Sequence, residues 1–132
     1  MDLVSELNVA SWAHDSHTAE IRLQPSDLII AATDGFFDVV HVFGSKGLAT
    51  RQYIRELYLE NQLDPGQLAE KLLLRAWNQV QSCRSMRPEN IDTPFFAQVK
   101  RADMLGKFQY MPEDDIAVVV SYVLQASGIS AL

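Results

Sequence analysis

The hydrophobic residues of this chain follow a two-residue period in some stretches, and some runs are almost continuously apolar. Residues 18–23 alternate polar and apolar side chains, which is the period of a half-buried strand. Residues 28–33 and 116–124 are nearly all apolar, which is typical of more fully buried strands, and we expect 116–124 to be central in a sheet. Residues 24–27 read Gln-Pro-Ser-Asp and favour a tight turn, so the first two strands are predicted to form an antiparallel hairpin.

Other stretches repeat their apolar residues at helical spacing. The pattern predicts a helix over residues 48–60 and a clearer one over 65–82, where Asp64 and Pro65 suit the N-cap and first helical positions. A further short helix is expected to begin at Thr93 and Pro94, after a loop that spans 83–92. Trp77 is expected to pack in the core or against the sheet. The predicted buried stripe of the 65–82 helix is Leu68, Leu72, Ala76 and Val80.

Composition narrows the class of protein. The 132 residues suffice for one ordinary domain, and strands and helices together indicate an α+β fold. The net charge of −6 argues against nucleic acid as a partner. No apolar run reaches the roughly 18 residues that a membrane span needs, and no basic leader precedes Arg22, so the chain as written is expected to be cytoplasmic. Cys83 is the only cysteine, which excludes an internal disulfide and a thiolate cluster.

Acidic residues stand at the ends of two predicted strands. Asp34-Gly35 leaves the strand at 28–33, Asp38 follows four residues after Asp34, and Glu113-Asp114-Asp115 enters the strand at 116–124. If these two strands are antiparallel neighbours, the acids converge, and crowded carboxylates need a cation among them. Hard oxygen ligands favour Mg²⁺ or Mn²⁺. The pattern is equally consistent with a plain Asp-Gly turn and a solvated strand start.

Carboxylates that hold such ions suit hydrolysis of a phosphate ester by a metal-activated water. A different phosphatase chemistry can be tested on the same residues. An aspartyl-phosphate mechanism of the haloacid-dehalogenase type needs Asp-x-Asp-Gly after a strand, with the first Asp as nucleophile. The first position is occupied by Ala32 here, so the attacking carboxylate is lacking. The sequence therefore favours a metal-activated water over a covalent intermediate.

The same segments resemble a known family. IIAATDGFFDVV, residues 29–40, resembles the Ala-Thr-Asp-Gly-aromatic-Asp motif of the metal-dependent type 2C (PPM-type) protein serine/threonine phosphatases, and EDDIAVVV, residues 113–120, resembles their closing motif. AEIRLQPSDLI, residues 19–29, is similar to the hairpin that precedes the first motif. Thr93-Pro94-Phe95 and Arg101-Ala102 resemble a segment of an often organellar eukaryotic branch. The resemblance covers about residues 18–124.

The resemblance implies both a fold and a site. The fold would be the carboxy-terminal half of a four-layer α-β-β-α sandwich with antiparallel sheets. Asp34 and Asp114 match direct ligands of Mg²⁺ or Mn²⁺, and Asp115 matches a position that orients them. Asp38 matches a residue that contacts the metal site indirectly or through water, and Gly35 also lies beside the ligands. The implied reaction is hydrolysis of phosphoserine or phosphothreonine in a phosphoprotein substrate by a water that two metal ions activate.

The chain departs from the family in one large respect. The family's amino-terminal half carries an Asp-Gly-His-Gly motif whose Asp bridges both metals, and the only Asp-Gly in this sequence is Asp34-Gly35. We therefore expect a partial phosphatase domain over 1–132 that is weakly active or inactive alone, with a second chain as a possible source of the missing half. The resemblance suggests a mitochondrial or plastid parent. The alternative function is a non-catalytic, phosphatase-like module that binds a protein.

Overall fold

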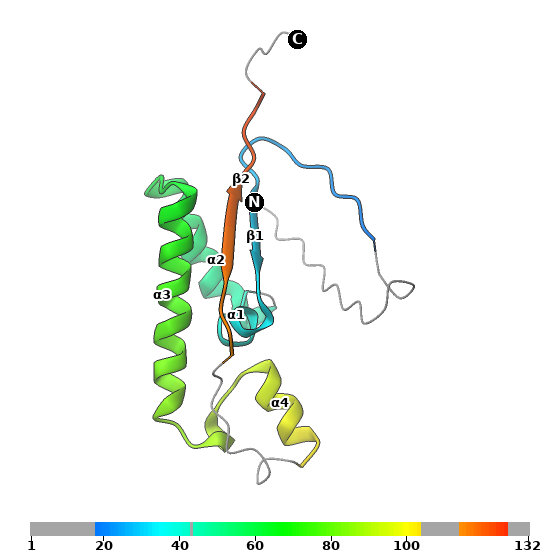
Figure 1. Cartoon of the computed structure of the whole chain (residues 1–132), viewed down its shortest axis with the longest axis vertical. Helices are drawn as coiled ribbons and strands as arrows, with labels where there is room; N and C mark the ends of the chain where they lie inside the picture. Colours follow the sequence, from blue (N-terminus) through cyan, green and yellow to red (C-terminus); the bar gives the residue numbers. More distant parts are fainter. Residues whose placement is uncertain (1–17, 43, 104–113, 127–132) are drawn as a thin grey trace. The chain divides into compact units, whose positions relative to one another are not determined.

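The computed structural model describes residues 18–42, 44–103 and 114–126, and its elements confirm the α+β class (Figure 1). The chain divides into two compact units, one formed by residues 30–120 and the other by residues 1–29 together with 121–132. The elements are β1 (Leu28–Ala32), α1 (Asp34–Val39), the 3-10 turn η2 (Ser45–Gly47), α2 (Leu48–Arg55), the π-helical segment η3 (Glu56–Glu60), α3 (Pro65–Arg84), the 3-10 turn η4 (Pro88–Asn90), α4 (Pro94–Arg101) and β2 (Val118–Tyr122).

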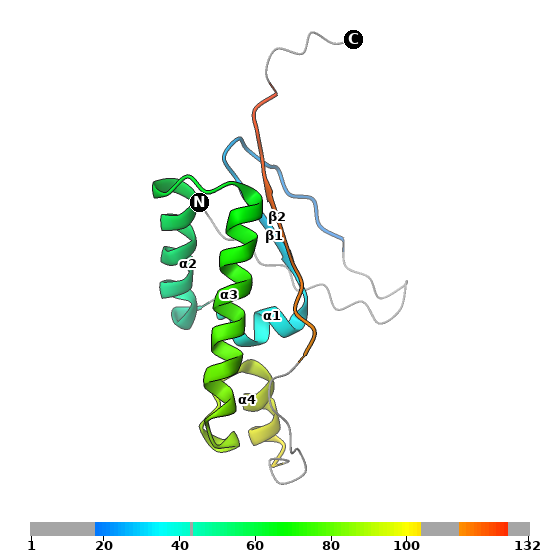
Figure 2. The same ribbon diagram turned by 60° about the vertical axis from the view of Figure 1, so that its left-hand side comes forward.

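β1 and β2 pair with each other in an antiparallel, two-stranded sheet, as Figures 1 and 2 show from two directions. Within the 30–120 unit, the backbone N–H of Thr33 donates to the carbonyl of Ala117 at 3.1 Å. Within the other unit, Ser26 N–H donates to Val123 O at 2.8 Å, and Val123 N–H donates to Asp27 O at 2.9 Å. The prediction that these two segments are antiparallel neighbours is therefore confirmed, although they are separated by most of the sequence.

The predicted strand at residues 18–23 is wrong, and with it the hairpin. These residues have no regular structure and are exposed. Their alternating pattern fits a strand, but β1 already pairs with β2, and no partner among the described residues pairs with the 18–23 segment. The turn that follows is confirmed: Asp27 N–H donates to Gln24 O at 3.0 Å, with Pro25 second and Ser26 third at a φ of 76°, as in a type II turn.

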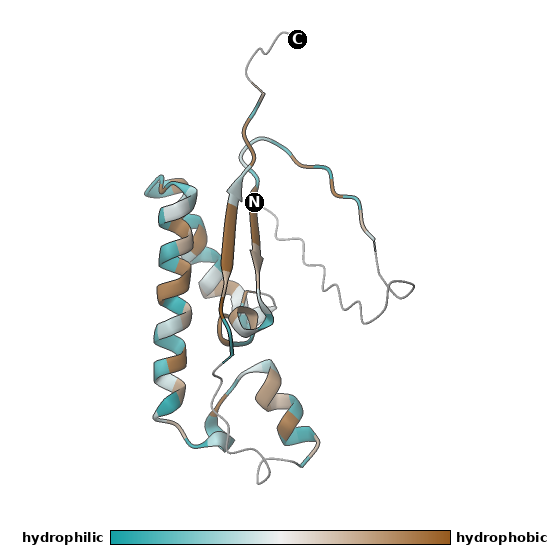
Figure 3. Ribbon diagram, viewed as in Figure 1, coloured by the Kyte–Doolittle hydropathy of each residue, from teal (hydrophilic) through white to brown (hydrophobic). Residues whose placement is uncertain are grey.

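The strands are less buried than their sequences predict. Residues of both strands alternate between half-buried and exposed, although Figure 3 shows both as hydrophobic. Within the 30–120 unit, helices α2 and α3 lie on one side of the ribbon (Figures 1 and 2). Val119 of β2 is 62% exposed. The prediction of a central strand at 116–124 is wrong for the described part of the chain, because β1 is the only partner there.

A short helix that the sequence pattern did not predict, α1, begins immediately after β1. Asp34 lies in its first turn, where a carboxylate is favoured by the positive end of the helix dipole. Gly35, Phe36 and Val39 of α1 are buried, and the helix packs against α3. Six residues give too few repeats for a helical period to be seen, which is why the pattern was missed.

The predicted helix at 48–60 exists but changes its winding midway. After α2 ends, the segment η3 continues with the wider π-helical turn, in which Asn61 N–H donates to Glu56 O at 2.9 Å. The Asn61 side chain donates to the same carbonyl at 3.0 Å. Both bonds from Asn61 satisfy the backbone carbonyl of Glu56 where the helical segment ends.

Helix α3 begins as the sequence predicts. The side chain of Asp64 accepts from Gln67 N–H at 2.8 Å, and the Gln67 side chain accepts from Asp64 N–H at 3.1 Å, which forms a reciprocal capping box. The placement of Trp77 in the core is wrong, because it is 53% exposed and the Arg84 guanidinium lies 5.6 Å from its ring centre. The predicted stripe is confirmed, with Leu68, Leu72, Ala76 and Val80 all buried.

Helix α4 is also confirmed. It packs with the end of α3 in a small hydrophobic core. Thr93 Oγ1 accepts from Phe96 N–H at 3.3 Å, which caps the helix. Cys83, Ile91 and Phe96 form a buried cluster, so part of the predicted 83–92 loop is ordered by η4 and by this packing. Among the described residues, no helix is long and apolar enough to cross a membrane.

Candidate metal centre at the end of the sheet

The two acidic segments meet at the end of the sheet where β1 becomes α1. A Cβ placed on Gly35 would lie 2.7 Å from the backbone oxygen of Asp115 and 3.0 Å from Cβ of Asp114. Only a residue without a side chain allows so close an approach. The residue next to Asp34 is therefore in direct contact with the Asp114-Asp115 segment, as expected for antiparallel neighbours.

The side chain of Thr33 links the two segments that meet here, which we call the junction: residues 33–35 and residues 114–117. Its Oγ1 donates to the backbone carbonyl of Asp115 at 2.8 Å and accepts from the backbone N–H of Ala117 at 3.1 Å. Thr33 stands at the N-cap of α1, yet its hydroxyl makes no cap bond there. The threonine of the Ala-Thr-Asp-Gly stretch thus links the start of α1 to the residues before β2. Sequence reasoning did not assign it this role.

The carboxylates of Asp34 and Asp114 are each held by the amide that follows. Asp34 Oδ1 accepts from Gly35 N–H at 2.8 Å, and Asp114 Oδ1 accepts from Asp115 N–H at 2.8 Å. Both residues are exposed, and the second oxygen of each carboxylate has no hydrogen-bond partner among the described residues. Each acid is oriented by its own backbone and retains an oxygen that can bind a cation.

Asp38 and Asp115 have structural contacts of other kinds. Asp38 Oδ1 accepts from the backbone N–H of Phe95 at 2.7 Å, which links α1 to the first turn of α4. Asp115 takes part in the junction through its backbone, which bonds to Thr33 and lies against Gly35. Both acids lie on the segments predicted from the sequence. The contacts of Asp38 give it a role in placing a helix.

The donor set fits a divalent ion in part. Carboxylate oxygens suit Mg²⁺ and Mn²⁺, and Mg²⁺ keeps several waters and uses only one or two carboxylates. No group of three or more His, Cys, Asp or Glu side chains suited to a metal occurs among residues 18–42, 44–103 and 114–126. Glu113 lies outside the described residues. Asp34 and Asp114 supply two carboxylates, the number that a hydrated Mg²⁺ uses, whereas a two-metal centre needs further acids.

A second polar cluster, which the sequence did not suggest, joins η2 to the loop before α4. Lys46 Nζ donates to both carboxylate oxygens of Asp92, at 2.7 and 2.8 Å, and His41 Nε2 donates to the Asp92 carbonyl at 3.0 Å. The hydrogen bond from Lys46, followed by its charge, lowers the pKa of Asp92 below the ordinary value. Both side chains are well exposed, so this pair contributes little to stability.

Comparisons of the chain with protein-family models, with curated proteins and with solved structures find no match. The family resemblance therefore rests on the sequence motifs alone.

Proposed function

We propose that this chain is the carboxy-terminal part of a metal-dependent type 2C protein serine/threonine phosphatase domain, with Asp34 and Asp114 as ligands of Mg²⁺ or Mn²⁺. The observation that carries the proposal is the contact of Gly35 with Asp114 and Asp115. Two motifs that lie far apart in the sequence meet at one end of the sheet, which supports the proposal. Antiparallel pairing brings the end of one strand beside the start of the other, and in this chain both of these segments carry aspartates.

The chain's own residues have three tasks in this proposal. Asp34 and Asp114 present the free oxygens that hold the cation, and Thr33 fixes the spacing of their two segments. Asp115 and Gly35 keep the backbones in contact, and Asp38 holds the amino end of α4. The bound ion supplies the acidity that generates hydroxide from water near neutral pH and neutralises phosphoryl oxygens. Phosphoserine or phosphothreonine in a protein is the substrate class.

The four-layer α-β-β-α sandwich is part of the same proposal. In a four-layer sandwich, the exposed face of a sheet such as β1–β2 would be covered by a second sheet, which also brings the remaining acids. Val119, at 62% exposure, supports such a covered face. We propose that a second polypeptide segment, on this or another chain, completes the sandwich and the two-metal site.

The metal part of the proposal is tested by titrating the purified chain with Mn²⁺ and measuring free Mn²⁺ by electron paramagnetic resonance. We expect weak, single-site binding that becomes at least about tenfold weaker in Asp34→Asn and in Asp114→Asn, because each loses a charged ligand oxygen. Asp103→Asn is the matched control, since this exposed acid lies in a turn at a φ of 53°, which Asn tolerates. Equal Mn²⁺ binding by all four proteins would refute the assignment.

The catalytic part is tested with a phosphothreonine peptide and excess Mn²⁺. The chain alone is expected to release little or no phosphate, because two aspartates do not form a two-metal centre. Robust turnover that Asp34→Asn abolishes would show that the site is complete within this chain. Robust turnover that survives Asp34→Asn and Asp114→Asn would overturn the mechanism altogether.

A second candidate function is a non-catalytic module that binds a protein. The exposed Val119 and the two strand edges of the β1–β2 sheet favour it, because such edges and faces pair readily with other chains. The Mn²⁺ titration separates the candidates. A binding module that has lost its catalytic role has no need for a cation at Asp34.

A further inference from the structure

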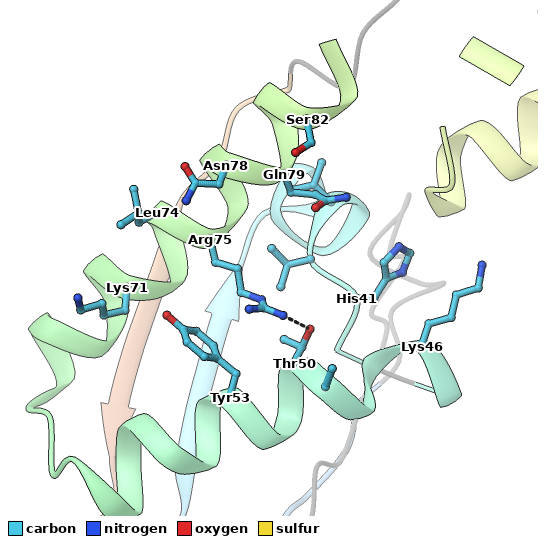
Figure 4. A pocket seen from close by; sticks show the side chains of 13 residues that line it. His41, Lys46, Thr50, Tyr53, Lys71, Leu74, Arg75, Asn78, Gln79 and Ser82 are labelled. Carbon is cyan, nitrogen blue, oxygen red and sulfur yellow. Dashed lines mark hydrogen bonds between the residues drawn. The ribbon is translucent and has the colours of Figure 1, made fainter. Parts of the chain in front are cut away.

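A cleft of about 470 Å³ lies between α2 and α3, within the 30–120 unit and lined by none of the proposed metal ligands (Figure 4). Its volume is in the range of pockets that hold small molecules, roughly 300–1,000 Å³. Apolar side chains such as Val40 and Leu74 form part of the wall, and polar side chains such as Thr50 and Asn78 form the rest. The cleft can therefore accept a ligand that has both an apolar and a charged part.

The charges that line this cleft all have one sign. Lys46, Lys71 and Arg75 contribute cations, and none of the described residues that line the cleft is Asp or Glu. Lys46 is already paired with Asp92, whereas no carboxylate among the described residues pairs with Lys71 or Arg75. In a chain of net charge −6, such a site concentrates positive potential locally. Two unpaired cations favour a ligand that carries two negative charges.

Arg75 is positioned by contacts that leave most of its donors available. Its guanidinium carbon lies 4.6 Å from the centre of the Tyr53 ring, and one terminal nitrogen donates a long hydrogen bond of 3.4 Å to Thr50 Oγ1. Figure 4 shows the side chain extended from α3 across the cleft toward α2. A guanidinium has five N–H donors, and stacking on a ring uses none of them. The group is thus held in place while its N–H edge remains free for an anion.

Lys71 adds a second positive charge to the lining of the cleft. It precedes Arg75 by four residues on α3, so the two side chains lie one turn apart on the same face of the helix. An arginine fork can bind two oxygens of a phosphate at once, and a lysine ammonium supplies a point charge to a third. Tyr53 and Leu74 also line the cleft and offer ring and aliphatic surface there.

We propose that the cleft between α2 and α3 binds a small, soluble phosphate monoester, with Arg75 as the main anchor, Lys71 as the second cation, and Tyr53 and Leu74 against the organic group. The proposal is independent of the metal centre. It uses different residues, and it requires no cation.

The test is calorimetric titration with phenyl phosphate in the presence of EDTA, which removes divalent ions and so separates this site from the proposed metal centre. We expect saturable binding to the unaltered chain, weaker binding of the singly charged phenyl sulfate, and a decrease in affinity as salt is raised. Arg75→Gln should weaken binding about tenfold or more, and Lys71→Gln several-fold, because each removes a charged donor. Circular dichroism checks that each variant is folded.

Arg55→Gln is the matched control, since Arg55 is an exposed arginine of α2 that does not line the cleft. It should bind as the unaltered chain does. If Arg75→Gln fails to fold, Lys71→Gln still provides the test, because Lys71 is exposed. The proposal is wrong if the unaltered chain does not bind phenyl phosphate, or if Lys71→Gln and Arg55→Gln lower the affinity equally, which would indicate attraction by general surface charge.

Discussion

At the residue scale, the candidate metal centre depends on the lack of a side chain at position 35. Gly35 is buried at a backbone crossing, and its α-carbon faces the carbonyl of Asp115 with no room for a methyl group. An Asp-Gly pair in the sequence is usually interpreted as a turn, in which glycine is chosen for its dihedral angles. Gly35 has no positive φ and is required for space. A glycine required for space is explained by its contact with Asp114, whereas a glycine required for its dihedral angles would not be.

We expect Gly35→Ala to lower the free energy of unfolding by about 1–3 kcal/mol, since the added methyl forces two backbones apart. Urea denaturation followed by circular dichroism measures the change. Gly66→Ala is the control: the new Cβ would meet only the end of the Asp64 side chain, at 3.3 Å, and alanine favours a helix. That variant should be unchanged or more stable by up to about 1 kcal/mol. Equal stability of the two variants would contradict the close packing.

Cys83 offers a second test at the same scale. Burial, and to a smaller extent the charge of Asp38, raises the pKa of its thiol above the ordinary value of 9.0. The unfolded chain therefore loses this proton at lower pH than the folded chain. The contribution to stability is complete below about pH 9 and is lost as the pH rises above it.

Two measurements check this prediction. A disulfide reagent at pH 8 should modify Cys83 much more slowly in the native chain than in urea. Urea midpoints between pH 8 and 10 should fall more steeply for the unaltered chain than for Cys83→Ala, which retains every other titrating group. Parallel pH profiles would show that the thiol titrates alike in both states.

At the element scale, helices were predicted better than strands. The capping residues and the four-residue repeat of α3 depend on contacts within twenty residues, so the sequence alone indicates them. A strand forms only if a partner is available to pair with it. Residues 18–23 have the pattern of a strand without a partner among the described residues, and β1 is completed by β2 from the far end of the sequence.

The cap of α3 provides the test at this scale. Asp64→Ala removes the acceptor for Gln67 N–H and should lower the free energy of unfolding by about 1 kcal/mol. Asp64→Asn keeps an oxygen in the same place and should lose a few tenths at most. Urea denaturation of both variants at one pH gives the comparison. A loss of similar size in both would mean that the charge, and not the hydrogen bond, stabilises the helix end.

At the scale of the whole molecule, the main feature of the described residues is a two-stranded sheet whose apolar surface is partly exposed. The β1–β2 sheet has helices α2 and α3 on one side in the 30–120 unit (Figures 1 and 2), and Val119 of β2 is exposed. The same sheet end presents two aspartates with free oxygens. Under the proposed function, one cause explains both features. The second segment that would cover the sheet would also bring the further acids that a two-metal site needs.

The sequence by itself determined the start and buried stripe of α3, the start of α4 and the α+β class. It also predicted the residues of the candidate metal centre, which stay a prediction. These features depend on residue type and on spacing along the chain. Tertiary structure alone decided that β1 pairs with β2, that Trp77 is exposed, and that Lys71 and Arg75 face a cleft without acids. The physical reason is the same in each case: pairing, exposure and charge balance depend on which distant segment lies alongside, and local pattern does not encode that.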